Sequence, residues 1–219
     1  MRAHFIFPLL VAGISTLSQP SRADGTEGIS GGGAGVFCPT TVTTQPAVQL
    51  LDFFEGKALK GYTINESASP YETQLAELTK YLDFDPVLAM YFKTTLAGIR
   101  ASVRFLPAGV SLNMPSDIGT LLINPPAGCT LGAIGYYDEG TLYVSTDAFQ
   151  SMSETQKAGF FAHEVLYKLY RMAWSIQNAG PARKLVAQVF AAERTKDQTM
   201  TLLKPLGFRG SPYHNGVKW

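Results

Sequence analysis

The sequence predicts an α+β protein in which a small antiparallel sheet packs with several helices. Three observations support this class. Apolar residues first recur at helical spacing, short runs rich in β-forming residues then follow between glycines and prolines, and helical spacing returns in the last third of the chain. The chain has no internal repeat, and helices before and after one group of strands define the α+β class.

The first helices are predicted before the strands. Residues 47–55 follow a proline and are expected to form a short helix that Gly56 stops. Residues 70–82 begin with a proline suited to a first turn and place leucines at helical spacing. A third helix is expected after Asp85, where another proline takes the first helical position.

The strands are predicted in the middle of the chain. Residues 102–106, 119–123 and 133–137 are short runs of β-forming residues between turn-forming residues. The Asp-Glu-Gly sequence at 138–140 joins the third run to residues 141–145, which is typical of a hairpin with a three-residue connection.

Two long helices are predicted after the hairpin. Ser153 and Gln156 match a capping box, which predicts a helix over residues 154–177. The Gly-Pro pair ending at Pro181 stops this helix and starts another, which is expected to run to about Lys204.

The chain ends differ from its middle in composition. Residues 24–37 begin with a glycine-rich stretch that has no lysine, so they are predicted to be a flexible leader and not a phosphate-binding loop. Residues 38–204 carry the helices and strands and are expected to form a single α+β domain. Prolines and glycines predict an irregular tail over residues 205–219.

Residues 1–23 have the pattern of a signal peptide. Arg2 precedes the apolar run at 5–14, and Ser21 and Ala23 fit the two small positions before a cleavage site. The apolar run is too short to cross a bilayer of about 30 Å, and no later segment reaches about 18 uninterrupted apolar residues. We therefore expect an exported protein without a transmembrane segment in its mature chain, located in the periplasm, at the outer envelope or outside the cell.

The charge balance excludes the long-range field of nucleic-acid-binding proteins. The chain has 18 basic and 17 acidic residues. Removal of the signal peptide takes away Arg2 and Arg22 and no acid, which leaves 16 basic residues against 17 acidic ones and a charge of −1. No nucleic-acid partner is expected. The sequence identifies no partner, and an envelope protein or a peptide is the candidate.

Both cysteines lie in the expected mature chain. In an oxidising compartment Cys38 and Cys129 are predicted to form a disulfide. Such a bridge closes a loop of about 90 residues and is worth about 4 kcal/mol in the chain-entropy model. Two buried free thiols, or a metal pair completed by His163, are the alternatives.

The helix predicted over 154–177 carries the candidate site. His163, Glu164, Tyr167 and Arg171 can form a polar cluster that binds an anionic group or performs acid–base chemistry, because histidine titrates nearest neutral pH and arginine binds carboxylates or phosphates.

A structural role is the alternative for the same residues. His163 is then a hydrogen-bonded core group, and Glu164 and Lys168 form an exposed pair four residues apart. Arg171 then binds a nearby acid, Asp117 or Asp147, and fixes the sheet to the helix.

A strand over 141–145, a turn and a helix with His163-Glu164 resemble the active-site helix of zincin metallopeptidases. In that family two histidines four residues apart bind zinc, and the glutamate after the first histidine activates water. The resemblance covers residues 134–175 and implies a zinc ligand at His163 and a general base at Glu164. The chain departs from the family at the second histidine, where it has Tyr167.

Further zinc ligands would come from Glu193, where some zincins take an acid from a later helix, or from His214 in the tail. A neutral phenol is a weak ligand that ionises only near pH 10. We therefore expect no cofactor, with zinc as the alternative.

The chain also resembles a group of uncharacterised exported proteins of Gram-negative bacteria, Bdellovibrio-like ones among them. The resemblance spans most of the expected mature chain and rests on a glycine-rich leader with an early cysteine, Leu50-Leu51-Asp52-Phe53-Phe54-Glu55, Asp117, Cys129, His163-Glu164-x-x-Tyr167 and Arg183. It implies that Tyr167 belongs to a pattern of its own, and it implies no activity.

Two functions follow as hypotheses. The first is a non-catalytic exported protein in which the His163-Glu164-x-x-Tyr167 helix is structural or holds a partner. The second is a divergent zincin-like hydrolase that acts on peptide or cell-wall substrates.

Overall fold

The computed structural model describes residues 32–39, 48–114, 116–138 and 140–204, together with the backbone of two short strands in the tail. Within these residues the chain has the predicted α+β fold, with seven α-helices and small sheets. The expected signal peptide and the first part of the expected leader lie outside the described residues. The tail strands β7 (Tyr213–His214) and β8 (Val217–Lys218) pair with each other, and the rest of the tail also lies outside.

The first sheet is antiparallel and has the strand order β2-β1-β4. Its strands are β1 (Ala34–Phe37), β2 (Val48–Leu50) and β4 (Thr130–Ala133). The assignment of residues 34–37 to a flexible leader is therefore wrong, because they form the central strand of this sheet. Close packing between β1 and β4 requires a glycine in β4: a Cβ atom on Gly132 would approach the ring of Phe37 in β1 to 2.6 Å.

The second sheet is mixed and has the order β3-β6-β5. Its strands are β3 (Arg104–Leu106), β5 (Gly135–Asp138) and β6 (Thr141–Ser145). β5 and β6 pair antiparallel and confirm the predicted hairpin, but Asp138 belongs to β5 and pairs with Thr141, so the connection is shorter than the three residues expected. β3 runs parallel to β6. The strand predicted at 119–123 is wrong: no strand forms there, because the backbone of this segment binds side chains of two helices.

The early helices are α1 (Leu51–Lys60), α2 (Tyr71–Tyr81) and α3 (Pro86–Ser102), and a 3₁₀ turn (Leu82–Phe84) precedes α3. The expected stop of the first helix at Gly56 is wrong. Gly56 is buried inside α1, where a Cβ atom would lie 2.5 Å from the Cβ of Ala187, and the helix ends at Gly61, whose φ is +67°. Asp85 caps α3 as expected, accepting hydrogen bonds from two backbone N–H groups.

The later helices are α4 (Thr146–Gln150), α5 (Glu154–Trp174), α6 (Gly180–Val189) and α7 (Lys196–Leu203). Ser153 caps α5 at the predicted position, but the side chain of Gln156 binds elsewhere than in the predicted capping box, since its Oε1 atom accepts the N–H of Leu50 at 2.7 Å. The single helix expected after Pro181 is wrong, because it is interrupted before Thr195, whose side chain forms a capping box with Gln198 and starts α7.

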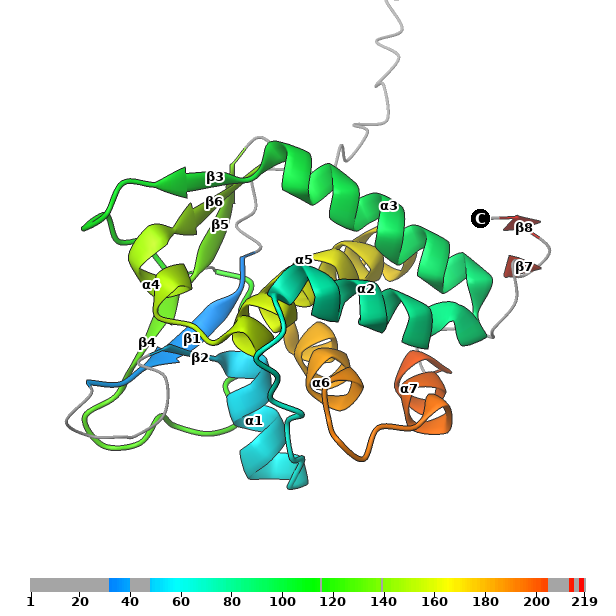
Figure 1. Cartoon of the computed structure of the whole chain (residues 1–219), viewed down its shortest axis with the longest axis horizontal. Helices are drawn as coiled ribbons and strands as arrows, with labels where there is room; N and C mark the ends of the chain where they lie inside the picture. The colour runs from blue at the N-terminus through cyan, green and yellow to red at the C-terminus, as the bar shows by residue number, and fades with distance from the viewer. Residues whose placement is uncertain are drawn as a thin grey trace, which may run out of the picture.

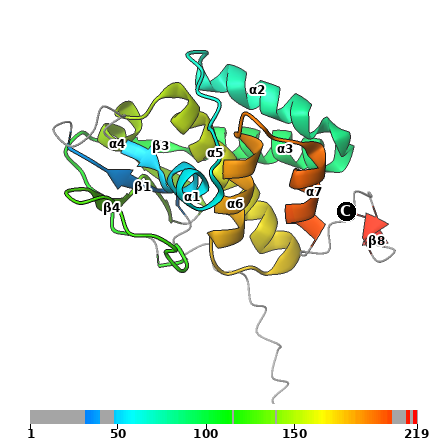
Figure 2. The same cartoon turned by 90° about the horizontal axis from the view of Figure 1, so that it is seen from below.

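Helix α5 occupies the centre of the fold. It packs against α2 and α3 on one side and against α6 on another, with the sheets near its first half (Figure 1). Seen from below, α1 lies beside α6 (Figure 2). Because elements cover α5 from several directions, most of its described residues are buried. A polar residue on this helix therefore has to find a partner inside the protein.

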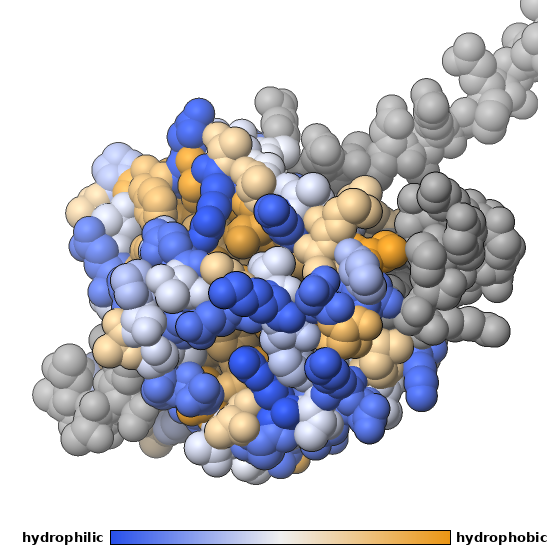
Figure 3. Space-filling view, turned by 45° about the vertical axis from the view of Figure 1, so that its right-hand side comes forward, coloured by the Kyte–Doolittle hydropathy of each residue, from blue (hydrophilic) through white to orange (hydrophobic). Residues whose placement is uncertain are grey.

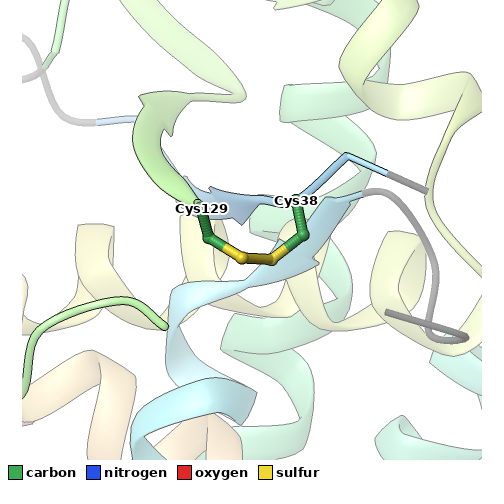
Figure 4. The surroundings of a disulfide bond; sticks show 2 residues. All are labelled: Cys38 and Cys129. Atoms are coloured by element: carbon green, nitrogen blue, oxygen red, sulfur yellow. A yellow bond between two sulfur atoms is a disulfide. The ribbon is translucent and has the colours of Figure 1, made fainter. Parts of the chain in front are cut away.

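The predicted disulfide is confirmed. Cys38 follows β1, Cys129 precedes β4, and the bond joins them across 91 positions of sequence (Figure 4). It lies beside a small apolar cluster built on Ala34, Val36 and Leu51, separate from the large core around α5.

Among the described residues, no helix is long and apolar enough to span a bilayer. On the face seen in Figure 3, hydrophilic and hydrophobic residues are interspersed. The described large apolar residues that are exposed are Leu59, Met90, Phe105, Val110, Met114, Leu121, Leu122 and Met172.

Candidate functional site

The His-Glu-x-x-Tyr sequence lies in the middle of α5 and is inside the protein. His163, Glu164 and Tyr167 are 1%, 0% and 2% exposed. One helical turn brings the side chains of His163 and Tyr167 to the same side of α5, and their ring centroids are 6.0 Å apart. Burial of three polar groups in one turn requires three sets of internal partners.

The partner of His163 is Asp52 in the first turn of α1. The Nδ1 atom of His163 lies 2.7 Å from Oδ1 of Asp52, and both side chains are buried. Burial alone would lower the pKa of His163, but the charge and hydrogen bond of Asp52, aided by Glu164, raise it above its ordinary value. The Nε2 atom of His163 has no hydrogen-bond partner among the described residues.

The partner of Glu164 is the backbone at the start of β1. Gly33 donates its N–H to Oε1 of Glu164 at 2.6 Å. Burial raises the pKa of Glu164 to about 7, although His163 and this hydrogen bond oppose the rise. Its Oε2 atom has no partner within the described residues.

The exposed ion pair expected between Glu164 and Lys168 is wrong. Glu164 is fully buried, so its carboxylate cannot reach the surface with Lys168. The ammonium of Lys168 instead lies 4.8 Å from the centre of the Tyr137 ring.

Tyr167 and Arg171 both reach Asp117, in the long connection between β3 and β4. The hydroxyl of Tyr167 donates to Oδ2 of Asp117 at 2.6 Å, and Nη1 of Arg171 lies 3.9 Å from the same oxygen. Burial, more than any other cause, raises the pKa of Asp117. The expected pairing of Arg171 with Asp117 is therefore present, but Asp117 lies in a connection and not in a sheet, so the pair does not join a strand to the helix. Asp147, the other expected acid, accepts a hydrogen bond from the backbone of Gly109.

A second buried ion pair lies nearby. Arg183 of α6 donates Nε to Oε2 of Glu55 at 2.7 Å, and the two residues are 2% and 5% exposed. Its Nη1 donates to the carbonyl of Ile118 and its Nη2 to that of Thr120 at 3.1 Å. Every nitrogen of this guanidinium therefore has an acceptor, as a buried arginine requires.

Sequence reasoning assigned no role to Asp52, Glu55 or Arg183. The two acids are three residues apart in an otherwise apolar run, so they share one face of α1. Two acids inside an apolar run are expected to be buried with partners, so this pattern could have identified Asp52 and Glu55 as part of the site. Arg183 carries no comparable signal, because its surroundings on α6 resemble those of an ordinary solvated helix.

The weaker metal candidates do not join the site in the part of the chain that the structure describes. Glu193 is exposed after α6 and accepts a hydrogen bond from the backbone of Thr63 at 3.3 Å. His214 lies in β7, and its side chain is outside the described residues. Among the described side chains no three His, Cys, Asp or Glu residues are placed to hold one metal ion.

Comparisons with protein-family models, with curated proteins and with solved structures find no match to this chain. The role of the site therefore has to be argued from its own geometry.

Proposed function

We propose that this is a non-catalytic exported protein of the periplasm or outer envelope, in which the His-Glu-x-x-Tyr helix is structural. The observation that supports this function is that His163, Glu164 and Tyr167 are each buried to 2% exposure or less. Each also binds a different segment: α1, the start of β1 and the connection before β4. A catalytic group must meet its substrate, whereas these side chains meet other parts of the same chain.

The disulfide supports the exported location. Cys38–Cys129 bonds of this structural kind persist in oxidising compartments and are rare in the cytosol. The signal-peptide pattern over residues 1–23 points to the same place. Together they favour a protein that works beyond the inner membrane.

Metal analysis combined with unfolding tests this function. The mature protein, purified without chelators, should contain far less than one zinc per molecule. His163→Ala should lower the free energy of unfolding by about 3 kcal/mol or more, because it leaves Asp52 as a buried charge without its partner. Glu77→Ala, at an exposed site of α2, is the matched control and should change stability by less than about 0.5 kcal/mol.

One observation favours the second candidate, a divergent zincin-like hydrolase of peptide or cell-wall substrates. Nδ1 of His163 is held by a carboxylate while Nε2 has no partner among the described residues, which is how metal-binding histidines are oriented. Stoichiometric zinc that is lost in His163→Ala would replace the first function with this one.

A further inference from the structure

Met172 lies near the end of α5 and is the most exposed of the large apolar residues that the structure describes. It is 76% exposed, whereas Met90 and Met114 are 60% and 38% exposed and Met152 is only 4% exposed. A small molecule dissolved in water therefore reaches the Met172 side chain more easily than that of any other described methionine.

The sulfur of Met172 has a hydrogen-bond donor beside it. The hydroxyl of Tyr91, in α3, donates to this sulfur, and the two atoms are 3.7 Å apart. Met90 precedes Tyr91 in α3, but consecutive helical residues point about 100° apart, so Met90 faces a different direction from the phenol. Exposure and a neighbouring donor thus coincide at Met172.

The Tyr91 hydroxyl keeps its proton and forms only a weak bond with it. Burial, more than any other cause, raises the pKa of Tyr91, so the phenol stays neutral at ordinary pH. A thioether sulfur is a weak acceptor. A stronger acceptor on the side chain at position 172 would therefore find a donor already in place.

Oxidation of the thioether supplies that acceptor. A lone pair of the sulfur attacks one oxygen of hydrogen peroxide, the O–O bond breaks, and the sulfur–oxygen bond of a sulfoxide forms. The proton on the transferred oxygen passes to the departing hydroxide, which leaves as water. The sulfur loses two electrons and the peroxide gains them, so the apolar side chain becomes a polar one.

The place of Tyr91 suits the oxygen of a sulfoxide. An O–H···O hydrogen bond spans about 2.7 Å. The 3.7 Å between the Met172 sulfur and the phenol leaves space for one oxygen bonded to the sulfur and hydrogen-bonded to Tyr91. A sulfoxide in a core disrupts the packing, because a polar group replaces an apolar one. Met172 is on the surface, so that cost is small and the new hydrogen bond determines the outcome.

We propose that Met172 is an oxidation site for peroxides and that the Tyr91 hydroxyl binds the oxygen of the resulting sulfoxide. Because Tyr91 belongs to α3 and Met172 to α5, oxidation then strengthens the contact between two packed helices. The proposal goes beyond the proposed function and does not depend on it, since neither residue belongs to the buried site on α5.

Peptide mapping by mass spectrometry tests where oxidation occurs. The mature protein, with its disulfide intact, is treated with hydrogen peroxide, and samples are digested at intervals. Met172 should gain one oxygen atom before the other methionines, at a rate on the order of tenfold or more above that of the buried Met152. Oxidation of Met172 that is no faster than that of Met152 overturns the proposal.

Urea unfolding tests what oxidation does. Met90→Leu/Met114→Leu confines surface oxidation to Met172. Peroxide should lower the equilibrium constant for unfolding of this variant about threefold to tenfold, the effect of one added hydrogen bond. The same treatment should change it by less than about twofold when Tyr91→Phe is added. Met172→Leu, with Met90 and Met114 in place, is the matched control, and oxidation should not stabilise it.

A permanent analogue of the sulfoxide gives a second test that needs no oxidant. Met172→Gln places an amide oxygen where the sulfoxide oxygen would lie, and glutamine and leucine have similar helix propensities. Met172→Gln should therefore be more stable than Met172→Leu, and Tyr91→Phe should remove the difference. An oxidised protein less stable than the untreated one, or a gain that persists in Tyr91→Phe, overturns the proposal. If Tyr91→Phe does not fold, equal stability of Met172→Gln and Met172→Leu overturns it.

Discussion

At the scale of single residues, Tyr167 lies at the position that a histidine occupies in a zinc-binding His-Glu-x-x-His helix, and its side chain offers different chemistry. Imidazole at this position would offer a ligand atom, whereas the phenol offers a donor. Its hydroxyl donates to Asp117 at 2.6 Å and so connects α5 to the long connection between β3 and β4. Burial and the neighbouring Asp117 raise the pKa of Tyr167, so the hydroxyl keeps the proton that this bond requires.

Removal of this hydroxyl should therefore cost stability. Tyr167→Phe keeps the ring but leaves the buried Asp117 carboxylate with one fewer donor, and we expect the free energy of unfolding to fall by about 1 to 3 kcal/mol. Urea unfolding measures the change. Tyr143→Phe, in the half-buried part of β6, is the control and should stay near the parent value; a Tyr167→Phe protein as stable as the parent would contradict the role given to the hydroxyl.

The burial of Glu164 predicts a pH-dependent stability. Its pKa is about 7 in the folded protein against 4.5 for the free side chain. The protonated acid is thus favoured by folding, so its contribution is complete below the unfolded pKa and is lost as the pH rises through about 7. Over this range the loss is on the order of 3 kcal/mol. The raised pKa values of His163 and Asp117 act in the same direction.

Unfolding at a series of pH values between about 5 and about 8 checks this prediction. The parent should become less stable as the pH rises. Glu164→Gln, which keeps an oxygen for the N–H of Gly33, should show a weaker pH dependence and gain relative to the parent at the alkaline end. Glu77→Gln, on the exposed face of α2, should leave the dependence unchanged. A parent protein that gains stability up to about pH 8 would exclude a protonated Glu164.

At the scale of elements, the features of the fold that the sequence predicted correctly are those that depend on residues close together in the chain. The caps of α3 and α5 and the β5–β6 hairpin were predictable, because Asp85, Ser153 and the turn residues act on their immediate neighbours. The predictions that proved wrong concern positions whose structure depends on contacts with distant parts of the chain. Gly56 looks like a helix stop until Ala187 is seen against it, and residues 34–37 look like a leader until two strands pair with them.

The same distinction applies to the residues of the candidate site. The His-Glu-x-x-Tyr sequence marked the correct turn of α5, and Asp117 was among the expected partners of Arg171. The partners of His163 and Glu164 were not predictable from spacing, because Asp52 is 111 positions away and Gly33 is 131 positions away.

The approach of β1 to α5 gives a test at this scale. A Cβ atom on Gly33 would lie 2.7 Å from a ring carbon of Phe160, so Gly33→Ala has to displace the ring or the strand that binds Glu164. We expect a loss of about 1 to 3 kcal/mol in the free energy of unfolding.

Gly98→Ala is the matched control for this substitution. Gly98 is exposed in α3, nothing lies within 4 Å of its added Cβ atom, and alanine favours a helix, so this variant should gain up to about 1 kcal/mol. The two variants should therefore differ in sign in the same chemical unfolding experiment. Equal effects would mean that β1 does not approach α5 as closely as described.

At the scale of the whole molecule, three buried polar contacts, which we call the polar core, join segments that are far apart in sequence. Glu55 and Arg183 are separated by 128 positions, Asp52 and His163 by 111, and Gly33 and Glu164 by 131. Each pair therefore forms only when two segments more than 100 positions apart in sequence come together. The buried groups therefore give little to early folding, and they fix which compact arrangement is the final one.

The disulfide lies outside the polar core but stabilises the fold that contains it. Cys38 and Cys129 are 91 positions apart, and the bond holds β1 beside β4 at the end of the strand that begins next to Gly33. Closing a loop of this length in the unfolded chain is worth about 4 to 5 kcal/mol in the chain-entropy model. The same bond also limits how far β1, which follows the donor to Glu164, can move from β4.

Reduction should therefore lower the free energy of unfolding by several kcal/mol, and Cys38→Ala/Cys129→Ala should reproduce the loss without reductant. Denatured, unreduced mature protein should show no free thiol. Because β1 carries the partner of Glu164, the reduced protein should exchange the Gly33 amide hydrogen faster than the oxidised one, while amides in the middle of α3 should change only as much as global stability does. Adding reductant to the double variant should change nothing; equal stability of the oxidised and reduced parent would show that the sheet and the polar core hold β1 without the bond.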